Sequence, residues 1–296
     1  AYREAIEGVS DPDDLIALRM DFGAVLRSVD KIDEAIAEYR AIYDLDPEQM
    51  GAVSALSELY RATSRFQELL EIYESRMELE TDPDSRRELA YGRASLYQEA
   101  LNQPEEAIAA YTDILNEYGP EEQEAFRALD SLYESLERWE DLASIIERRV
   151  ELSADIEEEA ALRYRLGQVY EHRLERKVEA TDLYRLVIAS APEHEGARVA
   201  LEGLLEDAEI GPLAAEILEP VYELQGAHEP LIRALRVRAA GASDPEERLE
   251  FLTKVAQVYA HEIGDVDAAF NAYAEAFEAA PNHADALSRL EMMALE

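Results

Sequence analysis

Residues 161–192 read ALRYRLGQVYEHRLERKVEATDLYRLVIASAP, and this stretch decides the fold of the chain. Apolar residues recur at spacings of three and four on both sides of a short polar segment. This spacing is typical of amphipathic helices that bury one face. We therefore expect two helices that pack against each other across a short turn, and Pro192 to end the pair.

The same pattern returns along the whole chain. Three segments align without a gap and carry two tyrosines at equivalent positions: 95–115, 168–188 and 257–277. Looser copies lie at 55–73 and 128–146, and another begins near Val25. The equivalent anchor positions are therefore 25, 60, 97, 133 and 170. A nearly constant period of this length, with two helices per unit, indicates a helical solenoid.

The units resemble tetratricopeptide repeats, of a degenerate, bacterial type. The best unit matches the family pattern at Leu166, Gly167, Tyr170, Ala180, Tyr184 and Pro192. Two departures are clear. The leading tryptophan of the pattern is absent throughout, and in the units of Tyr97, Tyr170 and Tyr259 the following alanine lies one residue farther away. The resemblance implies an all-α, right-handed α-solenoid (a superhelix) of antiparallel helix pairs.

Residue types at the other repeated positions fit this architecture. Small residues let the two helices of a pair approach closely: Ala35, Ala107, Ala180 and Ala269. Tyrosines are expected to pack between helices with their hydroxyls at polar edges. Aspartate precedes proline at positions 11, 82 and 244, which predicts helix N-caps. No glycine-centred calcium loop accompanies these aspartates, so capping is preferred to metal binding.

We predict a single solenoid over residues 1–296. Its parts are the tail of a preceding repeat at 1–10, helix pairs at 12–47, 48–82, 83–120, 121–155 and 156–192, an irregular three-helix segment at 193–242, a helix pair at 243–281, and the first helix of a further repeat at 282–296. Partial repeats at both ends predict a fragment of a longer array. The anchors Leu205 and Tyr222 are unusually close, which adds one helix and makes the fold irregular around 193–241. Pro220 is expected to kink that segment.

Composition and motifs narrow the function. The net charge is −39, from 67 acidic and 28 basic residues, which disfavours nucleic acid and anionic membranes as partners. The absence of cysteine excludes disulfides, thiol catalysis and cysteine-bound zinc. No metalloprotease, phosphate-loop or serine-hydrolase motif occurs. We therefore expect no enzyme, no catalytic residues, no metal and no cofactor. The compartment stays open, with the cytoplasm favoured because no signal peptide or membrane-spanning run is visible.

The resemblance implies that a peptide or helix of a partner protein binds a concave groove lined by the first helices of the pairs. Candidate groove residues are Arg61, Tyr91, Gln98, Arg127, Tyr164, Arg165 and Gln168. Arginine and aromatic residues suit an acidic or polar peptide. Alternatively, the arginines pair with glutamates of adjacent helices.

Three functions remain open at this point. The first is a non-enzymatic protein–protein interaction scaffold that uses this groove. The second is a regulatory or spacer region of a larger multidomain enzyme or signalling protein, with the catalytic part outside these residues. The third is a structural subunit that assembles through its lateral or convex faces.

Overall fold

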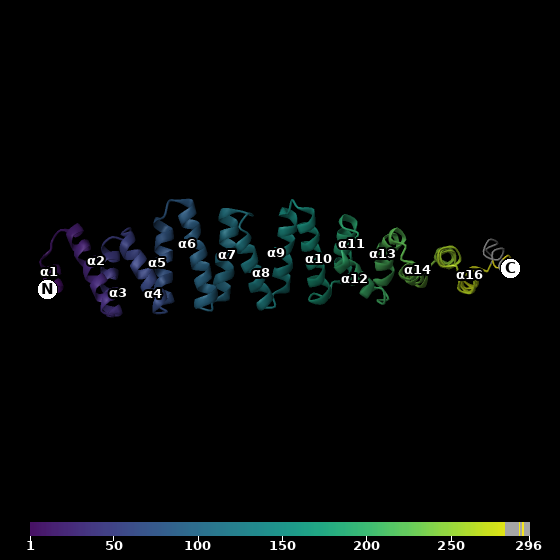
Figure 1. Cartoon of the computed structure of the whole chain (residues 1–296), viewed down its shortest axis with the longest axis horizontal. Coiled ribbons are helices and arrows are strands. Elements are labelled where there is room, and N and C mark those ends of the chain that lie inside the picture. Colours follow the sequence, from purple (N-terminus) through teal and green to yellow (C-terminus); the bar gives the residue numbers. More distant parts are fainter. Residues whose placement is uncertain (282–289, 291, 293–296) are drawn as a thin grey trace. The chain divides into compact units, whose positions relative to one another are not determined.

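The computed structural model describes residues 1–281 together with Leu290 and Met292. All regular secondary structure in these residues is helical (Figure 1). The chain divides into two compact units, unit 1 at Ala1–Leu136 and unit 2 at Glu137–Glu296. The all-α fold predicted from the periodicity is confirmed. The further helix predicted at 282–296 lies outside the described residues, apart from the two named above.

Unit 1 is a row of helices in which each helix contacts the next. Its elements are α1 (Tyr2–Gly8), α2 (Pro12–Ser28), α3 (Ile32–Leu45), α4 (Met50–Ala62), α5 (Phe66–Leu79), α6 (Pro83–Ser95), the π-helical turn η1 (Leu96–Ala100), α7 (Pro104–Tyr118) and α8 (Gln123–Ser135). Residues with a left-handed backbone (Asp30, Ser64 and Asn102) lie in the turns from α2 to α3, from α4 to α5 and from η1 to α7, so α2, α4 and α6 are the first helices of pairs.

Unit 2 continues with the same kind of elements. They are α9 (Trp139–Leu152), α10 (Ile156–His172), α11 (Lys177–Ser190), α12 (Glu195–Leu204), α13 (Gly211–Gln225), α14 (His228–Gly241), α15 (Pro245–Gln257), the π-helical turn η2 (Val258–Ile263) and α16 (Val266–Ala279). The pairs are α10 with α11, α13 with α14, and α15 with α16. The three-helix segment expected around 193–241 is therefore present as α12, α13 and α14.

One residue with a left-handed backbone makes the turn inside each pair. In chain order these residues are Asp30, Ser64, Asn102, Glu175, Gly226 and Gly264. In the shorter turns the next N–H bonds to a carbonyl five residues back, as Lys31 N does with Leu26 O at 2.9 Å. This geometry satisfies the free carbonyls at the end of the first helix. A sharp reversal with satisfied backbone brings the second helix back along the first.

The one-residue departure from the family spacing has a structural cause. In the units of Tyr97, Tyr170 and Tyr259 the turn is wider, and an N–H bonds to the tyrosine carbonyl six residues back. These bonds are Gln103 N to Tyr97 O at 2.8 Å, Arg176 N to Tyr170 O at 2.8 Å, and Asp265 N to Tyr259 O at 3.0 Å. The turns η1 and η2 take up the extra residue in two of the three units. An inserted residue is commonly absorbed in this way.

A tyrosine ring on the second helix packs against a glycine on the first. Tyr184 of α11 is fully buried, and a Cβ on Gly167 of α10 would lie 2.5 Å from its ring. Tyr39 and Gly23 make the same contact between α3 and α2. The four small residues predicted to allow close approach (Ala35, Ala107, Ala180 and Ala269) are all completely buried. Close helix packing within each pair therefore depends on these small residues.

The tyrosine hydroxyls reach polar edges, as expected from the sequence. The donors and acceptors are Tyr184 to Glu171 at 2.8 Å, Tyr222 to Glu202 at 2.7 Å, Tyr97 to Glu74 at 3.0 Å, and Tyr170 to Glu147. These four hydroxyls fit the expectation, whereas those of Tyr43 and Tyr118 are buried without a hydrogen-bond partner in the described residues.

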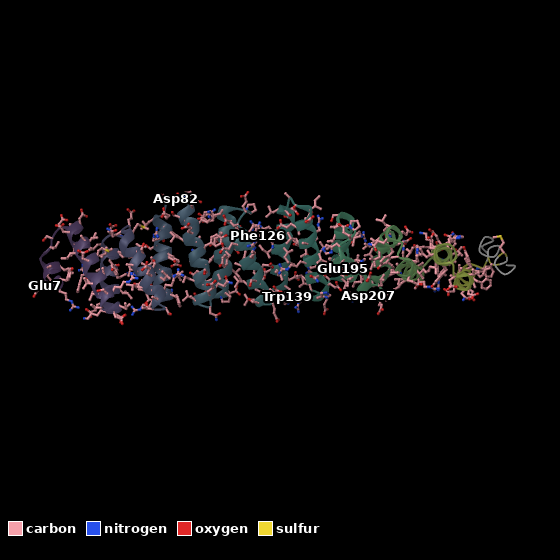
Figure 2. All side chains as sticks on the ribbon, viewed as in Figure 1. Glu7, Asp82, Phe126, Trp139, Glu195 and Asp207 are labelled. Carbon is pink, nitrogen blue, oxygen red and sulfur yellow. The ribbon has the colours of Figure 1, made fainter. Side chains whose placement is uncertain are left out.

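The predicted N-caps are confirmed. Asp11 accepts from the backbone N–H groups of residues 13 and 14, and Asp82 accepts from Ser85 N at 2.9 Å (Asp82 is labelled in Figure 2). Asp244 accepts from Glu246 N at 3.1 Å. In each case proline follows at the first helical position, where its missing N–H leaves no helical bond unmade.

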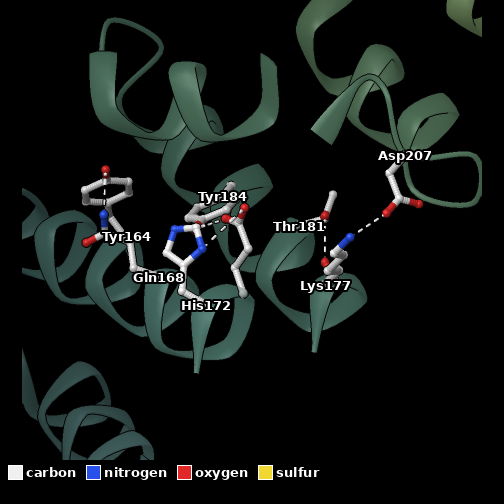
Figure 3. A network of polar contacts seen from close by, with 8 residues as sticks. Tyr164, Gln168, His172, Lys177, Thr181, Tyr184 and Asp207 are labelled. Atoms are coloured by element: carbon white, nitrogen blue, oxygen red, sulfur yellow. Dashed lines mark hydrogen bonds and ion pairs between the residues drawn. The ribbon is translucent and has the colours of Figure 1, made fainter. Parts of the chain in front are cut away.

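Helix α12 is the added element, because α13 and α14 form a pair with the usual left-handed turn at Gly226. It packs against both α11 and α13. An ion pair, called here the clamp, holds the segment that follows the C-terminal end of α12: Lys177 Nζ of α11 lies 2.6 Å from Asp207 Oδ2 (Figure 3). Asp207 Oδ1 also accepts from the N–H groups of Glu209 and Ile210. Helix α13 runs on through Pro220 without a break.

Gly167→Ala should lower the stability of the chain. The added methyl group would force the buried Tyr184 ring out of its site, which costs about 1–3 kcal/mol. The matched control is Gly203→Ala on α12, where a Cβ meets nothing within 4 Å and helix propensity improves. Urea unfolding followed by circular dichroism measures both. An equal midpoint for the two variants would contradict the packing described for Gly167.

Asp207→Asn should destabilise the chain in a pH-dependent way. The hydrogen bond from Lys177, and then those from the Ile210 and Glu209 N–H groups, lower the pKa of Asp207 from 3.8 to about 2. A depressed pKa means that the ionised form contributes stability above pH 3.8, and that this contribution is lost as the pH falls to about 2. Urea midpoints of wild type and variant, compared at the same pH, should differ at pH 6 and converge near pH 2. A difference that stays constant over this range would count against the clamp.

Candidate peptide-binding face

The seven residues predicted for the groove lie on first helices or their ends in both units. In unit 1 they are Arg61 on α4, Tyr91 on α6, Gln98 in η1 and Arg127 on α8; in unit 2 they are Tyr164, Arg165 and Gln168 on α10. Arg61 and Arg127 are exposed, whereas the other five are half-buried. Two questions therefore decide what this face can bind: what the half-buried side chains already contact, and which cations are free.

Tyr91 connects its own helix pair to the start of the next helix. Its ring centroid lies 6.3 Å from that of Tyr111 on α7. Its hydroxyl donates to Glu122 Oε2 at 2.8 Å, and Glu122 is the residue immediately before α8. Burial and this hydrogen bond raise the pKa of Tyr91 well above its ordinary value. The phenol is thus a neutral donor that helps to seat α8.

Tyr164 has the equivalent role in unit 2. Its ring lies 5.9 Å from Tyr184 on α11 and 4.9 Å from His194, the N-cap residue of α12. A Cβ on Gly196 would lie 2.7 Å from the same ring. Gln168 Nε2 donates to the Tyr164 hydroxyl at 3.0 Å, so the structure brings these two predicted residues together (Figure 3).

Neither set of ring contacts was foreseen from the sequence. The signal that was available is the spacing, since Tyr91 and Tyr164 stand at the same place in the units 83–120 and 156–192. The partners Glu122 and His194 belong to the following helix, so a pattern confined to one unit does not reveal them. Both tyrosines therefore present partial ring surfaces, with part of each ring committed to packing between helices.

Most arginines of the described residues are paired with carboxylates, and the pairs of Arg19 and Arg87 illustrate this. Arg19 Nη1 lies 2.5 Å from Glu38 Oε2 between half-buried side chains of α2 and α3. Arg87 is within 4 Å of both Asp84 and Glu122. Such pairs on a wet surface contribute about 0–1 kcal/mol each. They use up most of the positive charge of a strongly acidic chain.

Arg61 and Arg127 differ from this majority. Arg61 Nη2 donates to the Tyr73 hydroxyl at 2.9 Å rather than to a carboxylate. Arg127 is exposed and has no hydrogen-bond or ion-pair partner anywhere in residues 1–281. Arg165, the third predicted arginine, is half-buried and engaged in a contact. The predicted face thus carries one guanidinium held by a phenol and one that is fully available.

Two other cations of unit 2, Arg238 and Lys254, pair with a buried carboxylate. The Glu219 side chain is only 8% exposed, and it accepts from both Arg238 and Lys254, the latter at 3.0 Å. Arg238 also lies over the ring of Phe251 at 4.2 Å. A carboxylate buried to this extent requires both positive partners. Lys254 is therefore committed to joining α15 to α13, and is not free to bind a ligand.

Two negative findings hold for the described residues alone. No group of three or more histidine, aspartate or glutamate side chains in them is arranged to hold a metal ion. None of their helices combines the length and the apolar character needed to cross a membrane.

Two segments of the chain match a known family, and each match covers two successive helices and the start of a third. A family model described as tetratricopeptide repeat matches residues 52–87 and 125–160. The first match covers α4, α5 and the start of α6, and the second covers α8, α9 and the start of α10. No curated protein sequence matches the chain.

Many solved structures are similar to parts or most of the chain. YrrB, described as a TPR protein with an unusual peptide-binding site, is 19% identical, with 68% of this chain and 98% of that chain covered and a TM-score of 0.35. A tetratricopeptide repeat protein from Parabacteroides merdae is 16% identical, with 94% and 98% covered and a TM-score of 0.35. A chain from the Naa15/Naa10 complex bound to HypK is 14% identical, with 93% and 60% covered and a TM-score of 0.41.

The identification combines the matched segments with the contacts that surround them. In both units, helices of 13 to 17 residues are paired through one left-handed turn, and in one pair of each unit a tyrosine ring packs on a glycine of the partner helix. These are the elements that the repeat pattern encodes. The chain is built of helix pairs, and two of its segments match the tetratricopeptide repeat family.

Proposed function

We propose that this chain is a non-enzymatic scaffold that holds a segment of a partner protein against its first helices. Tetratricopeptide repeat proteins are generally non-catalytic scaffolds for protein–protein interaction. Repeated helix pairs present one exposed stripe per first helix, and neighbouring stripes form an extended surface. The candidate residues Arg61, Tyr91, Gln98 and Arg127 lie on such stripes in unit 1, and Tyr164, Arg165 and Gln168 lie on one in unit 2.

The single observation that carries the proposal is the free guanidinium of Arg127. A chain with 67 acidic residues offers many carboxylates, yet none in the described part pairs with this exposed arginine. Arginine presents a planar set of N–H donors that matches carboxylates. The expected ligand is therefore an acidic or polar peptide segment that brings its own carboxylate to Arg127.

The other predicted residues suit the remainder of such a ligand. Arg61 donates a single hydrogen bond to Tyr73, which leaves other guanidinium N–H groups for a second carboxylate or a backbone carbonyl. The exposed edges of Tyr91 and Tyr164 offer flat apolar contact next to polar groups. Gln98 is half-buried and supplies amide donors and acceptors. Each unit would therefore combine a polar contact with a partial ring surface.

The net charge of the chain makes binding of an acidic peptide a stringent test of this proposal. The net charge of −39 repels an acidic peptide from most of the surface, so measurable binding would require a local contact such as that with Arg127. Non-specific attraction, which complicates tests of basic ligands, is therefore not expected for this acidic peptide. Salt should therefore weaken the local contact with Arg127 while it screens the general repulsion.

Arg127→Glu should weaken binding of an acidic peptide. The probe is a fluorescein-labelled peptide of about 12 residues rich in Glu, Leu and Tyr, and its counterpart has Gln at each Glu. Fluorescence anisotropy should show that the acidic form binds the wild type, and that the variant binds about tenfold more weakly or worse, since a charged hydrogen bond is lost and repulsion is added.

The matched control is Arg248→Glu on α15, which carries the same charge change at another exposed arginine without a partner in residues 1–281. It should bind the acidic peptide with the affinity of the wild type. Equal losses in the two variants would show a general charge effect and overturn the role given to Arg127. Failure of the wild type to bind the acidic peptide would overturn the ligand class.

A further inference from the structure

An apolar cleft lies in unit 2 between α11 and α13, beside the added helix α12. Its volume is about 410 Å³, within the range of about 300–1,000 Å³ that ligand pockets occupy. Apolar side chains of both helices line it, among them Ile188, Ile217, Pro220, Val221 and Leu224. It occurs at the place where a single extra helix interrupts the alternation of first and second helices.

The lining consists of buried side chains at the base of the cleft, called here the floor, and one exposed side chain at its edge, Leu224, called here the lip. Ile188, Ile217 and Val221 are 6%, 8% and 5% exposed, so they form a firm floor that is part of the core. Leu224, near the end of α13, is 81% exposed, more than any other large apolar side chain in the described residues. A large apolar side chain left in water beside an apolar cleft is typical of an interaction site.

One cation and one carboxylate line the cleft, and within the described residues only the carboxylate is unpaired. Arg185 borders the cleft, but its guanidinium is 3.6 Å from Asp182 and is thereby neutralised. Glu216 also borders the cleft, is exposed, and has no ion-pair partner within residues 1–281. Glu193 follows the lining residue Pro192 and is likewise exposed. A ligand that places a cation beside Glu216 would meet an unpaired carboxylate.

We propose that this cleft docks a short amphipathic helix of another protein, with apolar side chains on the floor and a lysine or arginine beside Glu216. A helix is favoured because the cleft runs between two helices, and the all-helical described part offers no strand edge for an extended peptide. A second copy of this chain is disfavoured, because two chains of net charge −39 repel each other. A basic, apolar segment is attracted instead.

This site is distinct from the face described under the proposed function. That face uses first helices and the free guanidinium of Arg127, and it selects an acidic or polar segment. The cleft uses the second helix α11 together with α13, and it selects a basic, apolar one. The two sites share no residue and require opposite ligand charges, so one can fail while the other stands.

The test uses the full chain and a defined peptide. The probe is a fluorescein-labelled peptide of about 14 Leu and Lys residues with Leu at helical spacings of three and four, and its scrambled form has the same composition. Binding is measured at about 0.3 M NaCl, which screens general attraction between a basic peptide and an acidic chain. The wild type should bind the amphipathic form with one-to-one stoichiometry, and the scrambled form about tenfold more weakly.

Leu224→Glu should weaken binding of the amphipathic peptide by about tenfold or more, because a charge replaces the apolar lip. The matched control is Ile156→Glu at the start of α10, which makes the same charge change at an apolar side chain that is 65% exposed and outside the cleft. It should bind as the wild type does. Glu216→Gln should bind more weakly than the wild type and with a smaller dependence on salt.

Three results would overturn the proposal. The first is equal affinity of Leu224→Glu and Ile156→Glu for the amphipathic peptide. The second is equal affinity of the wild type for the amphipathic and scrambled peptides. The third is sedimentation of the wild type as a dimer that Leu224→Glu converts to a monomer, because the occupant would then be a second copy. All of these variants change exposed side chains, so folding is checked by circular dichroism before binding is measured.

Discussion

The close contact between a tyrosine ring and a residue without a bulky side chain sets the spacing of the helix pairs. Tyr184 lies where a side chain on Gly167 would otherwise be, and Tyr39 does the same over Gly23. The ring fills the space between two helices, and the hydroxyl at its far end reaches a carboxylate such as Glu171. Apolar packing and a satisfied hydrogen bond are thus obtained from one side chain, Tyr184, in the pair of α10 and α11.

Packing between helices also explains why few side-chain groups of the candidate face are free to bind a partner. Tyr91 and Tyr164 stand on first helices, yet each spends part of its ring on a tyrosine of its own pair and meets the residue that precedes the next helix. What remains for a partner is ring edge, amide groups and guanidinium. Because the chain is so acidic, most arginines are already paired, and this is why the proposed function rests on the exposed Arg127, the one unpaired arginine among the candidate residues in the described part of the chain.

Much of the fold could be predicted from the sequence because helix period, caps and small residues are local signals. The spacing of tyrosines places the pairs, and the close anchors Leu205 and Tyr222 reveal an added helix. The pattern does not show which helix is the added one; the left-handed turn at Gly226 assigns it to α12. The division into a single solenoid over all residues stays a prediction, since the structure describes two compact units.

The chemistry of the sites was harder to foresee. The sequence pattern does not show which arginines are engaged in contacts: Arg127 and Arg165 both fit the pattern, yet only Arg165 has a contact in the described residues. The apolar cleft depends on how closely α11 and α13 approach beside a helix of only 10 residues, which no single repeat encodes. Sequence periodicity thus predicts faces of helices, whereas function depends on contacts between repeats.

Native-state hydrogen exchange in rising urea tests most directly whether these tyrosine contacts couple neighbouring helices. Tyr184 joins α11 to α10, and Tyr164 joins α10 to α12. If the contacts carry the stability of this region, the most protected amides of α10, α11 and α12 should merge into one opening reaction with a shared free energy. Separate openings of α10 and α11, each with its own free energy and urea dependence, would contradict this.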